Sequence, residues 1–144
     1  FYMKFGWATF PQTNFELELH AKKQFEPSSW IVRAFDAETD LAQISQIYDE
    51  HNIMILPSFT EATPYVVDES LSRRRPVIIF EEISHVVGSK KGIFIAKRNS
   101  ESLLEKIEYI RSNYSKIQED MKNNNLPLKK DFLKEFQSSI LNFN

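Results

Sequence analysis

A helix start at residues 63–64 is the stretch best suited to bind a charged ligand. Thr63 suits the N-cap and Pro64 the first position of a helix, because proline has no N–H to donate there. The backbone N–H groups of Tyr65 and Val66 would then lack acceptors within the helix, with the positive end of the helix dipole behind them. The sequence therefore predicts an anion site at this position.

Two glutamates flank this helix start. Glu61 precedes it in the loop, and Glu69 shares a helix face with Tyr65 one turn further on. An anion site between two carboxylates suits a ligand with a negative group in its middle and hydroxyls at both ends, which describes a nucleotide sugar. The alternative is that Glu61 and Glu69 are ordinary solvated carboxylates, a pattern that spacing alone does not exclude.

Hydrophobic periodicity places the helix, predicted over residues 64–74, between two buried strands at 53–56 and 76–80. Other strands are predicted at 15–20, 30–35 and 92–96, and helices at 41–52, 103–117 and 129–144. Alternating strands and helices predict an α/β fold, a Rossmann-like three-layer domain with a mostly parallel sheet. Ligands in such folds bind beyond the carboxyl ends of the strands.

His20 ends one of these predicted strands, so it is a candidate for ligand contact, although a partly exposed loop histidine is the alternative. Asp36 and Glu38 also follow an apolar strand and imitate an acidic metal-binding motif, but such short acidic pairs are common, and we favour a helix-capping role. We predict no metal site. Residues 73–75, three arginines about 15 Å from the helix start, are expected to cap the helix or face solvent.

Composition narrows the class of protein. A net charge of -2 over 144 residues argues against nucleic acid as a partner, and the absence of cysteine removes disulfides and thiolate metal sites. No apolar run reaches the roughly 20 residues that cross a bilayer, so we expect a soluble, cytoplasmic protein. The chain begins at Phe1 inside an apolar pattern, which suggests a piece of a longer polypeptide, truncated at its N-terminus.

The segment from residue 57 to 79 resembles the signature of retaining GT-B glycosyltransferases of family 4. Those enzymes carry two glutamates, here Glu61 and Glu69, between a strand ending in Pro-Ser and a strand starting with Pro-Val. The resemblance extends over roughly residues 15–117. It implies that residues 1–144 form the C-terminal, donor-binding half of a GT-B fold, with a terminal helix at 129–144 and the acceptor domain outside this chain.

The resemblance also implies roles for the site residues. Glu69 would bind the ribose hydroxyls, the amides near Tyr65 and Val66 the diphosphate, and Glu61, the catalytic candidate, the hydroxyls of the transferred sugar. The full enzyme would be a retaining hexosyltransferase that needs no metal and no cofactor. It would serve polysaccharide biosynthesis on a glycan or lipid-linked acceptor bound by the N-terminal domain, with peripheral membrane association. This chain alone is expected to be inactive.

Several positions depart from the family pattern. The chain has only 3 glycines; Ala62-Thr63 and Arg74-Arg75 stand where the family usually has glycine, and His85 stands where it often has glutamate. The family's diphosphate-binding basic loop follows a first strand that we expect to precede Phe1. These departures motivate one alternative, a catalytically degenerate scaffold or interaction domain. A second alternative is a flavodoxin-like or receiver domain, in which the glutamate pair would be incidental.

Overall fold

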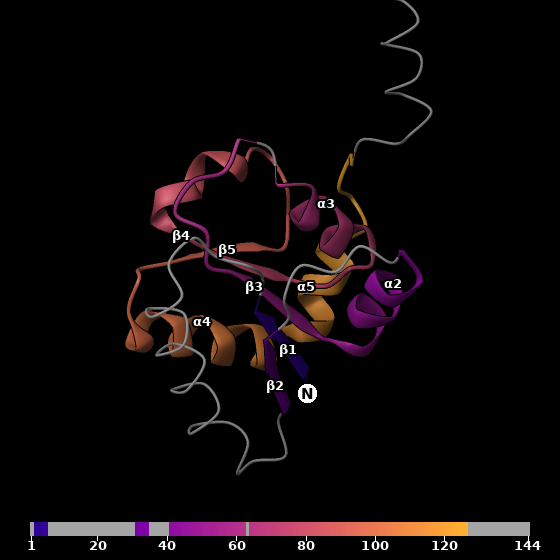
Figure 1. Cartoon of the computed structure of the whole chain (residues 1–144), viewed down its shortest axis with the longest axis horizontal. Coiled ribbons are helices and arrows are strands. Elements are labelled where there is room, and N and C mark those ends of the chain that lie inside the picture. The colour runs from indigo at the N-terminus through magenta and orange to yellow at the C-terminus, as the bar shows by residue number, and fades with distance from the viewer. Residues whose placement is uncertain (1, 6–30, 35–40, 63, 127–144) are drawn as a thin grey trace, which may run out of the picture.

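The computed structural model describes residues 2–5, 31–34, 41–62 and 64–126 (Figure 1). Within these residues five strands form one sheet in the order β2-β1-β3-β4-β5, and every neighbouring pair is parallel. The strands are β1 (Tyr2–Phe5), β2 (Ile31–Ala34), β3 (Ile53–Leu56), β4 (Val77–Phe80) and β5 (Ile93–Ala96). This confirms the predicted α/β, Rossmann-like fold with a parallel sheet.

Two of the three inner strands, β3 and β4, form the centre of the core. All eight of their residues are buried, and Ile55 pairs with Ile78 across the two strands. Helices cover both faces of a parallel sheet, so a central strand has no solvent face and its sequence is a continuous apolar run. This explains why both strands could be predicted to within one residue.

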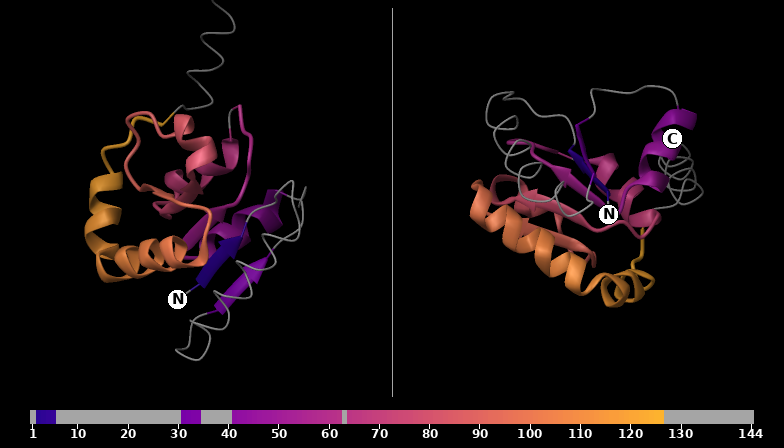
Figure 2. Two further views of the ribbon diagram at one scale, coloured as in Figure 1. Left: turned by 90° about the vertical axis from the view of Figure 1, so that its left-hand side faces the viewer. Right: turned by 90° about the horizontal axis from the view of Figure 1, so that it is seen from below.

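Helices lie on both sides of the sheet. They are α2 (Leu41–Glu50), α3 (Tyr65–Ser72), α4 (Ser100–Ser112) and α5 (Tyr114–Met121), with a 3-10 segment η2 (Glu81–Val86) after β4. Figure 2 shows α4 and α5 on one side of the sheet and α2 on the other. Side chains of α2 and α3 bond to each other, so these two helices share a layer. The result is the predicted three-layer arrangement.

Helix α3 is shorter than predicted at both ends. Pro64 occupies the N-cap, with φ -78° and ψ 90°, instead of the first helical position. At the other end Arg73 is the C-cap, and Arg74 has a left-handed backbone with φ 54°. A residue in that conformation ends the hydrogen-bonded turn, which is why the helix does not reach residue 74.

The single helix predicted over residues 103–117 is wrong: the structure has two helices, α4 and α5, that meet at Asn113. The Asn113 side chain donates to the Tyr109 carbonyl at 2.9 Å, and its backbone leaves the helical region with φ -118°. Asparagine competes for backbone groups in this way, which favours helix ends. The change of direction brings the Tyr114 hydroxyl to the Asn52 carbonyl at 3.0 Å.

The predicted strand at residues 15–20 and the predicted helix at 129–144 lie outside the described residues. The described sheet is continuous from β2 to β5, with β1 paired to β2 on one side and to β3 on the other. Three loops leave the carboxyl ends of β3, β4 and β5, and they gather at one edge of the sheet (Figure 1).

Candidate functional site

Glu61 lies in the loop after β3, where the carboxyl ends of the strands meet, and two neighbouring residues hold it there. The buried Ser58 donates its hydroxyl to Glu61 Oε1 at 2.6 Å. His85, on η2, places Nε2 2.8 Å from the Glu61 carbonyl oxygen. The Glu61 side chain itself is half-buried, and its Oε2 accepts no hydrogen bond from the described residues. Within the described residues, the Glu61 backbone and one carboxylate oxygen are therefore held, and the other oxygen has no donor.

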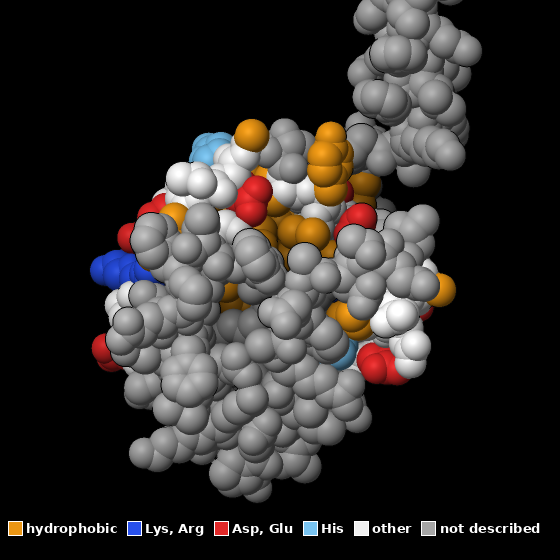
Figure 3. All heavy atoms as spheres, in the orientation of Figure 1, with side chains coloured by type: hydrophobic (Ala, Val, Ile, Leu, Met, Phe, Trp, Pro, Cys, Tyr) orange, Lys and Arg blue, Asp and Glu red, His pale blue; other side chains and the backbone are white. Residues whose placement is uncertain are grey.

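The start of α3 is exposed. Tyr65 is 73% and Val66 36% exposed, and hydrophobic side chains reach the surface over α3 in Figure 3. No side chain among the described residues caps the helix start, so the N–H groups of Tyr65 and Val66 have no acceptor within the helix. The predicted cap, Thr63, lies outside the described residues. An exposed, uncapped helix start is compatible with the predicted anion site.

Glu69 turns toward α2. Tyr48 donates its hydroxyl to Glu69 Oε2 at 3.0 Å, and the same hydroxyl lies 3.2 Å from the Val66 carbonyl oxygen. The Tyr48 ring is buried, and the Arg73 guanidinium lies 5.3 Å from its centroid. Burial, and then the negative charge of Glu69, raise the pKa of Tyr48 well above its usual range. Tyr48 therefore stays a neutral donor to the Glu69 carboxylate.

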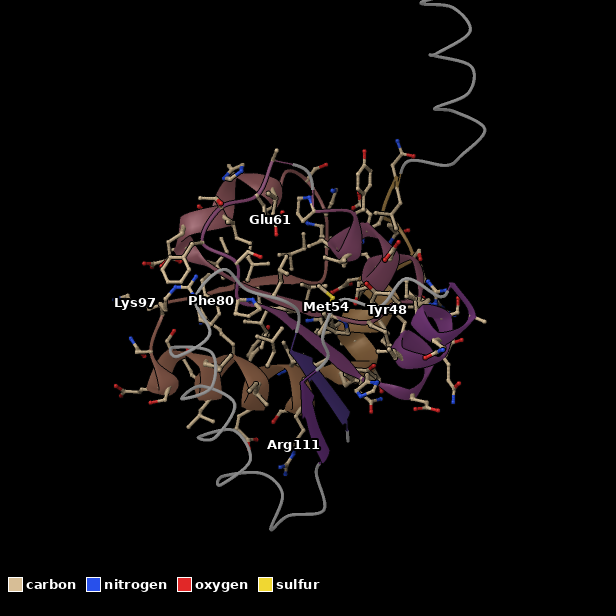
Figure 4. All side chains as sticks on the ribbon, viewed as in Figure 1. Tyr48, Met54, Glu61, Phe80, Lys97 and Arg111 are labelled. Atoms are coloured by element: carbon tan, nitrogen blue, oxygen red, sulfur yellow. The ribbon has the colours of Figure 1, made fainter. Side chains whose placement is uncertain are left out.

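The two glutamates are anchored separately. Glu61 bonds to groups at the carboxyl edge of the sheet, whereas Glu69 bonds to α2, and no hydrogen bond among the described residues links the two carboxylates. In Figure 4 Glu61 lies on the loop above the strands, whereas Tyr48 lies on α2. The start of α3 lies between Glu61 and Glu69 along the chain. Within the described residues, the two carboxylates therefore have separate supports and share no hydrogen bond.

Arg98 was not predicted as a site residue. Its side chain contacts the loop that carries Glu61. It follows β5 by two residues, and its side chain is 11% exposed. It pairs with Glu82 at 2.8 Å and stacks on Phe59 and Phe80. The hydrogen bonds from Arg98 lower the pKa of Glu82, so this carboxylate stays charged into acidic solution. Its position after a parallel strand was the signal that could have identified Arg98.

Two of the three arginines after α3 make structural contacts through their side chains, and Arg74 is exposed. Arg75 donates to the carbonyls of Tyr48 and Asp49 at the end of α2, and Arg73 pairs with Asp49 at 3.4 Å. The expectation of helix capping is thus correct, but Arg75 caps the neighbouring helix α2. His20, Asp36 and Glu38 lie outside the described residues.

The described residues contain no group of three or more histidine, aspartate or glutamate side chains placed to hold a metal ion. None of the helices in the described ranges combines the length and hydrophobicity that spanning a bilayer requires.

A family model described as "Glycosyl transferases group 1" matches residues 16–113. The chain belongs to this glycosyltransferase family. The match ends one residue after α4 and includes Glu61, Glu69 and the loops at the carboxyl ends of β3, β4 and β5. In this group 1 glycosyltransferase domain, both members of the glutamate pair thus lie within the family-matched region.

Other comparisons of this glycosyltransferase chain add less. No curated protein matches it. A crystal structure of the LacI family transcriptional regulator CCPA from Weissella paramesenteroides, with bound glucose, is similar at a TM-score of 0.49 and 10% identity. That likeness covers 90% of this chain, which spans 56% of the regulator's chain.

Proposed function

We propose that residues 1–144 form the C-terminal, donor-binding domain of a retaining hexosyltransferase. In this proposal the full enzyme moves a sugar from a nucleotide-diphosphate sugar to a glycan or lipid-linked acceptor, which a separate N-terminal domain binds. It works in polysaccharide biosynthesis in the cytoplasm, with peripheral membrane association. Family membership supports the glycosyl-transfer chemistry, and the parallel α/β sheet supports the nucleotide-binding half.

One observation carries the proposal: the family match includes a helix with an exposed start that no described side chain caps, with a carboxylate before it and another one turn into it. The N–H groups of Tyr65 and Val66 hold the diphosphate, with Thr63 and Pro64 as further donor-binding residues. Glu69 accepts hydrogen bonds from the ribose hydroxyls, and Glu61 from the hydroxyls of the transferred sugar. His20 is a further donor-binding residue in this proposal.

In this proposal the domain supplies no nucleophile. It contributes to catalysis by stabilising the leaving diphosphate. As the glycosidic bond breaks, negative charge grows on the diphosphate, and preorganised N–H donors at the start of α3 stabilise that charge. The Glu61 carboxylate near the sugar stabilises the positive charge that develops on its ring. The acceptor hydroxyl oxygen forms the new bond to the anomeric carbon as the bond to the diphosphate breaks, and the hydroxyl proton passes to the leaving diphosphate. In this proposal neither step needs a divalent metal ion.

Saturation-transfer NMR tests the proposal. The full chain is mixed with UDP-, GDP- and ADP-linked sugars in buffer containing EDTA. We expect saturation transfer to the ribose and sugar protons of one nucleotide class, and loss of most of that signal in Glu69→Ala. A folded chain that gives no signal with any of these compounds would contradict the proposal and favour a scaffold role.

A further inference from the structure

The Arg98 guanidinium lies between two aromatic rings. Its Cζ atom is 3.7 Å from the centroid of Phe59 and 4.4 Å from that of Phe80. Phe59 belongs to the loop after β3, and Phe80 ends β4, whereas Arg98 follows β5. One side chain therefore joins the ends of three adjacent strands. Because the site is shielded from water, its stacking interactions are stronger than they would be on the surface.

Hydrogen bonds fix the plane of this guanidinium. Nη1 donates to the Pro57 carbonyl at 3.1 Å, and Nη2 donates to the Ser58 carbonyl at 2.9 Å. Nε and Nη2 donate to the two carboxylate oxygens of Glu82 at 2.8 and 3.2 Å. All three guanidinium nitrogens are thus engaged, and Glu82 neutralises the charge. Arg98 is therefore not free to neutralise a phosphate.

The hydrogen bond from Arg98 to the Ser58 carbonyl connects Arg98 to Glu61 through one residue. Arg98 holds the Ser58 carbonyl, and the hydroxyl of the same residue donates to Glu61 Oε1 at 2.6 Å. On the far side of the loop, His85 contacts the Glu61 carbonyl. If the Pro57 and Ser58 carbonyls lose their donor, the Ser58 hydroxyl has no fixed position from which to orient the Glu61 carboxylate.

We propose that Arg98 is a positioning residue for Glu61, acting through the backbone of Pro57 and Ser58. This inference rests on the proposed function for the identity of what Glu61 holds, the transferred sugar of a nucleotide sugar. It assigns Arg98 to the sugar end of the ligand and not to the diphosphate. A lysine could not replace it, because an ammonium group lacks the planar fork that stacks on rings and bonds two carbonyls and a carboxylate together.

The experiment compares the full wild-type chain with Arg98→Lys and, as a matched control, Arg111→Lys, whose exposed side chain pairs with Glu108 on α4. Two quantities are measured. The first is the set of 15N order parameters at Phe59, Thr60 and Glu61. The second is the affinity for UDP, GDP and ADP and for UDP-glucose, GDP-mannose and ADP-glucose.

In Arg98→Lys we expect order parameters at residues 59–61 to fall from about 0.85 to below about 0.6, while those of β4 stay unchanged. Affinity for the nucleotide sugar should fall about tenfold, with affinity for the free nucleoside diphosphate unchanged. In a Glu61→Ala background the same substitution should have little further effect, because coupled residues are not additive. Glu82→Gln, which keeps the guanidinium but weakens its pairing, should give a smaller change with the same pattern.

Unchanged order parameters at residues 59–61 would overturn the inference. So would an equal loss of affinity for diphosphate and nucleotide sugar, since that would make Arg98 a diphosphate ligand or a general stabiliser. If the wild-type chain binds none of the six compounds, the proposed function fails, and the order parameters alone decide whether Arg98 holds the Glu61 loop.

Discussion

At the scale of single residues, the candidate site depends on side chains that hold its carboxylates. Tyr48 bonds to Glu69, and Ser58 bonds to Glu61. Both supporting residues are buried, whereas Glu69 is exposed and Glu61 half-buried. A buried donor has few alternative positions, so it fixes the carboxylate more firmly than another surface side chain would. The support for each glutamate therefore comes from a different element.

Replacing Tyr48 with phenylalanine removes the hydroxyl that Glu69 and the Val66 carbonyl share. We expect a loss of about 1–2 kcal/mol in the free energy of unfolding at pH 8, because hydrogen bonds to charged groups are among the stronger ones. Urea denaturation measures this loss. Tyr109→Phe, at a 53% exposed position, is the control and should change stability by less than about 0.5 kcal/mol.

The effect of Tyr48→Phe should also depend on pH. Folding raises the pKa of Tyr48 above the value of about 10 found in unfolded chains, so the folded state favours the neutral hydroxyl. Its stabilising contribution is complete below pH 10 and is lost as the pH rises through and beyond that value. The stability gap between wild type and Tyr48→Phe should therefore shrink between pH 10 and pH 12. A gap that grows with pH would contradict this account.

At the scale of elements, the ends of α3 and β5 depend on unusual backbone conformations. Arg74 has a φ of 54° where glycine would carry no steric cost. The sequence has arginine where the family that it resembles usually has glycine, but residue types alone do not reveal the backbone angle. The structure now gives a physical reason for the glycine preference.

Arg74→Gly should stabilise the chain, by up to about 1 kcal/mol, because it removes the left-handed strain of a residue with a Cβ atom. The Arg74 backbone carbonyl, which accepts from Gln118, stays in place. Thermal unfolding measures the gain. Ser72→Gly, in the last turn of α3, should instead destabilise the chain by about 0.5–1 kcal/mol. If both substitutions lower the melting temperature, strain at Arg74 is not significant.

Gly92 precedes β5 with φ 87°, and a Cβ atom there would lie 2.5 Å from the Met121 sulfur. We expect Gly92→Ala to cost roughly 2–4 kcal/mol through strain and overpacking against α5. Gly88 is the matched control, with φ 54° and no atom within 4 Å of an added Cβ. Gly88→Ala should cost only about 1 kcal/mol. Equal costs in urea denaturation would show that α5 does not pack on Gly92 as described.

At the scale of the whole molecule, the sequence predicted the strands and layers better than the points at which helices end. Continuous apolar runs identify β3 and β4 because both faces of these strands are buried. The break at Asn113 was missed, because apolar residues continue at helical spacing across it, and the asparagine side chain decides the end of α4. Hydrophobic periodicity indicates which residues are buried. It does not detect a side chain that competes for the backbone hydrogen bonds of a helix.

From the sequence, candidate site residues could be proposed only within single segments. The glutamate pair and the helix start between them became candidates because they lie within nine residues of one another in the chain. Arg98 and Tyr48 were missed, because the former lies 40 residues from Ser58 and the latter 21 from Glu69. Contacts at such separation depend on strand order, which a single sequence does not specify.

The most direct test of the central claim is a 15N NMR titration of the full chain with the nucleotide sugar that gives the strongest saturation transfer. We expect the amide signals of Tyr65 and Val66 to shift, and Glu69→Ala to weaken affinity at least tenfold, since it removes hydrogen bonds to the ribose from a charged acceptor. Glu108→Ala, at an exposed carboxylate on α4, should bind as the wild type does. Shifts confined to residues away from α3, or equal affinities for Glu69→Ala and Glu108→Ala, would contradict the assignment of this helix start as the donor site.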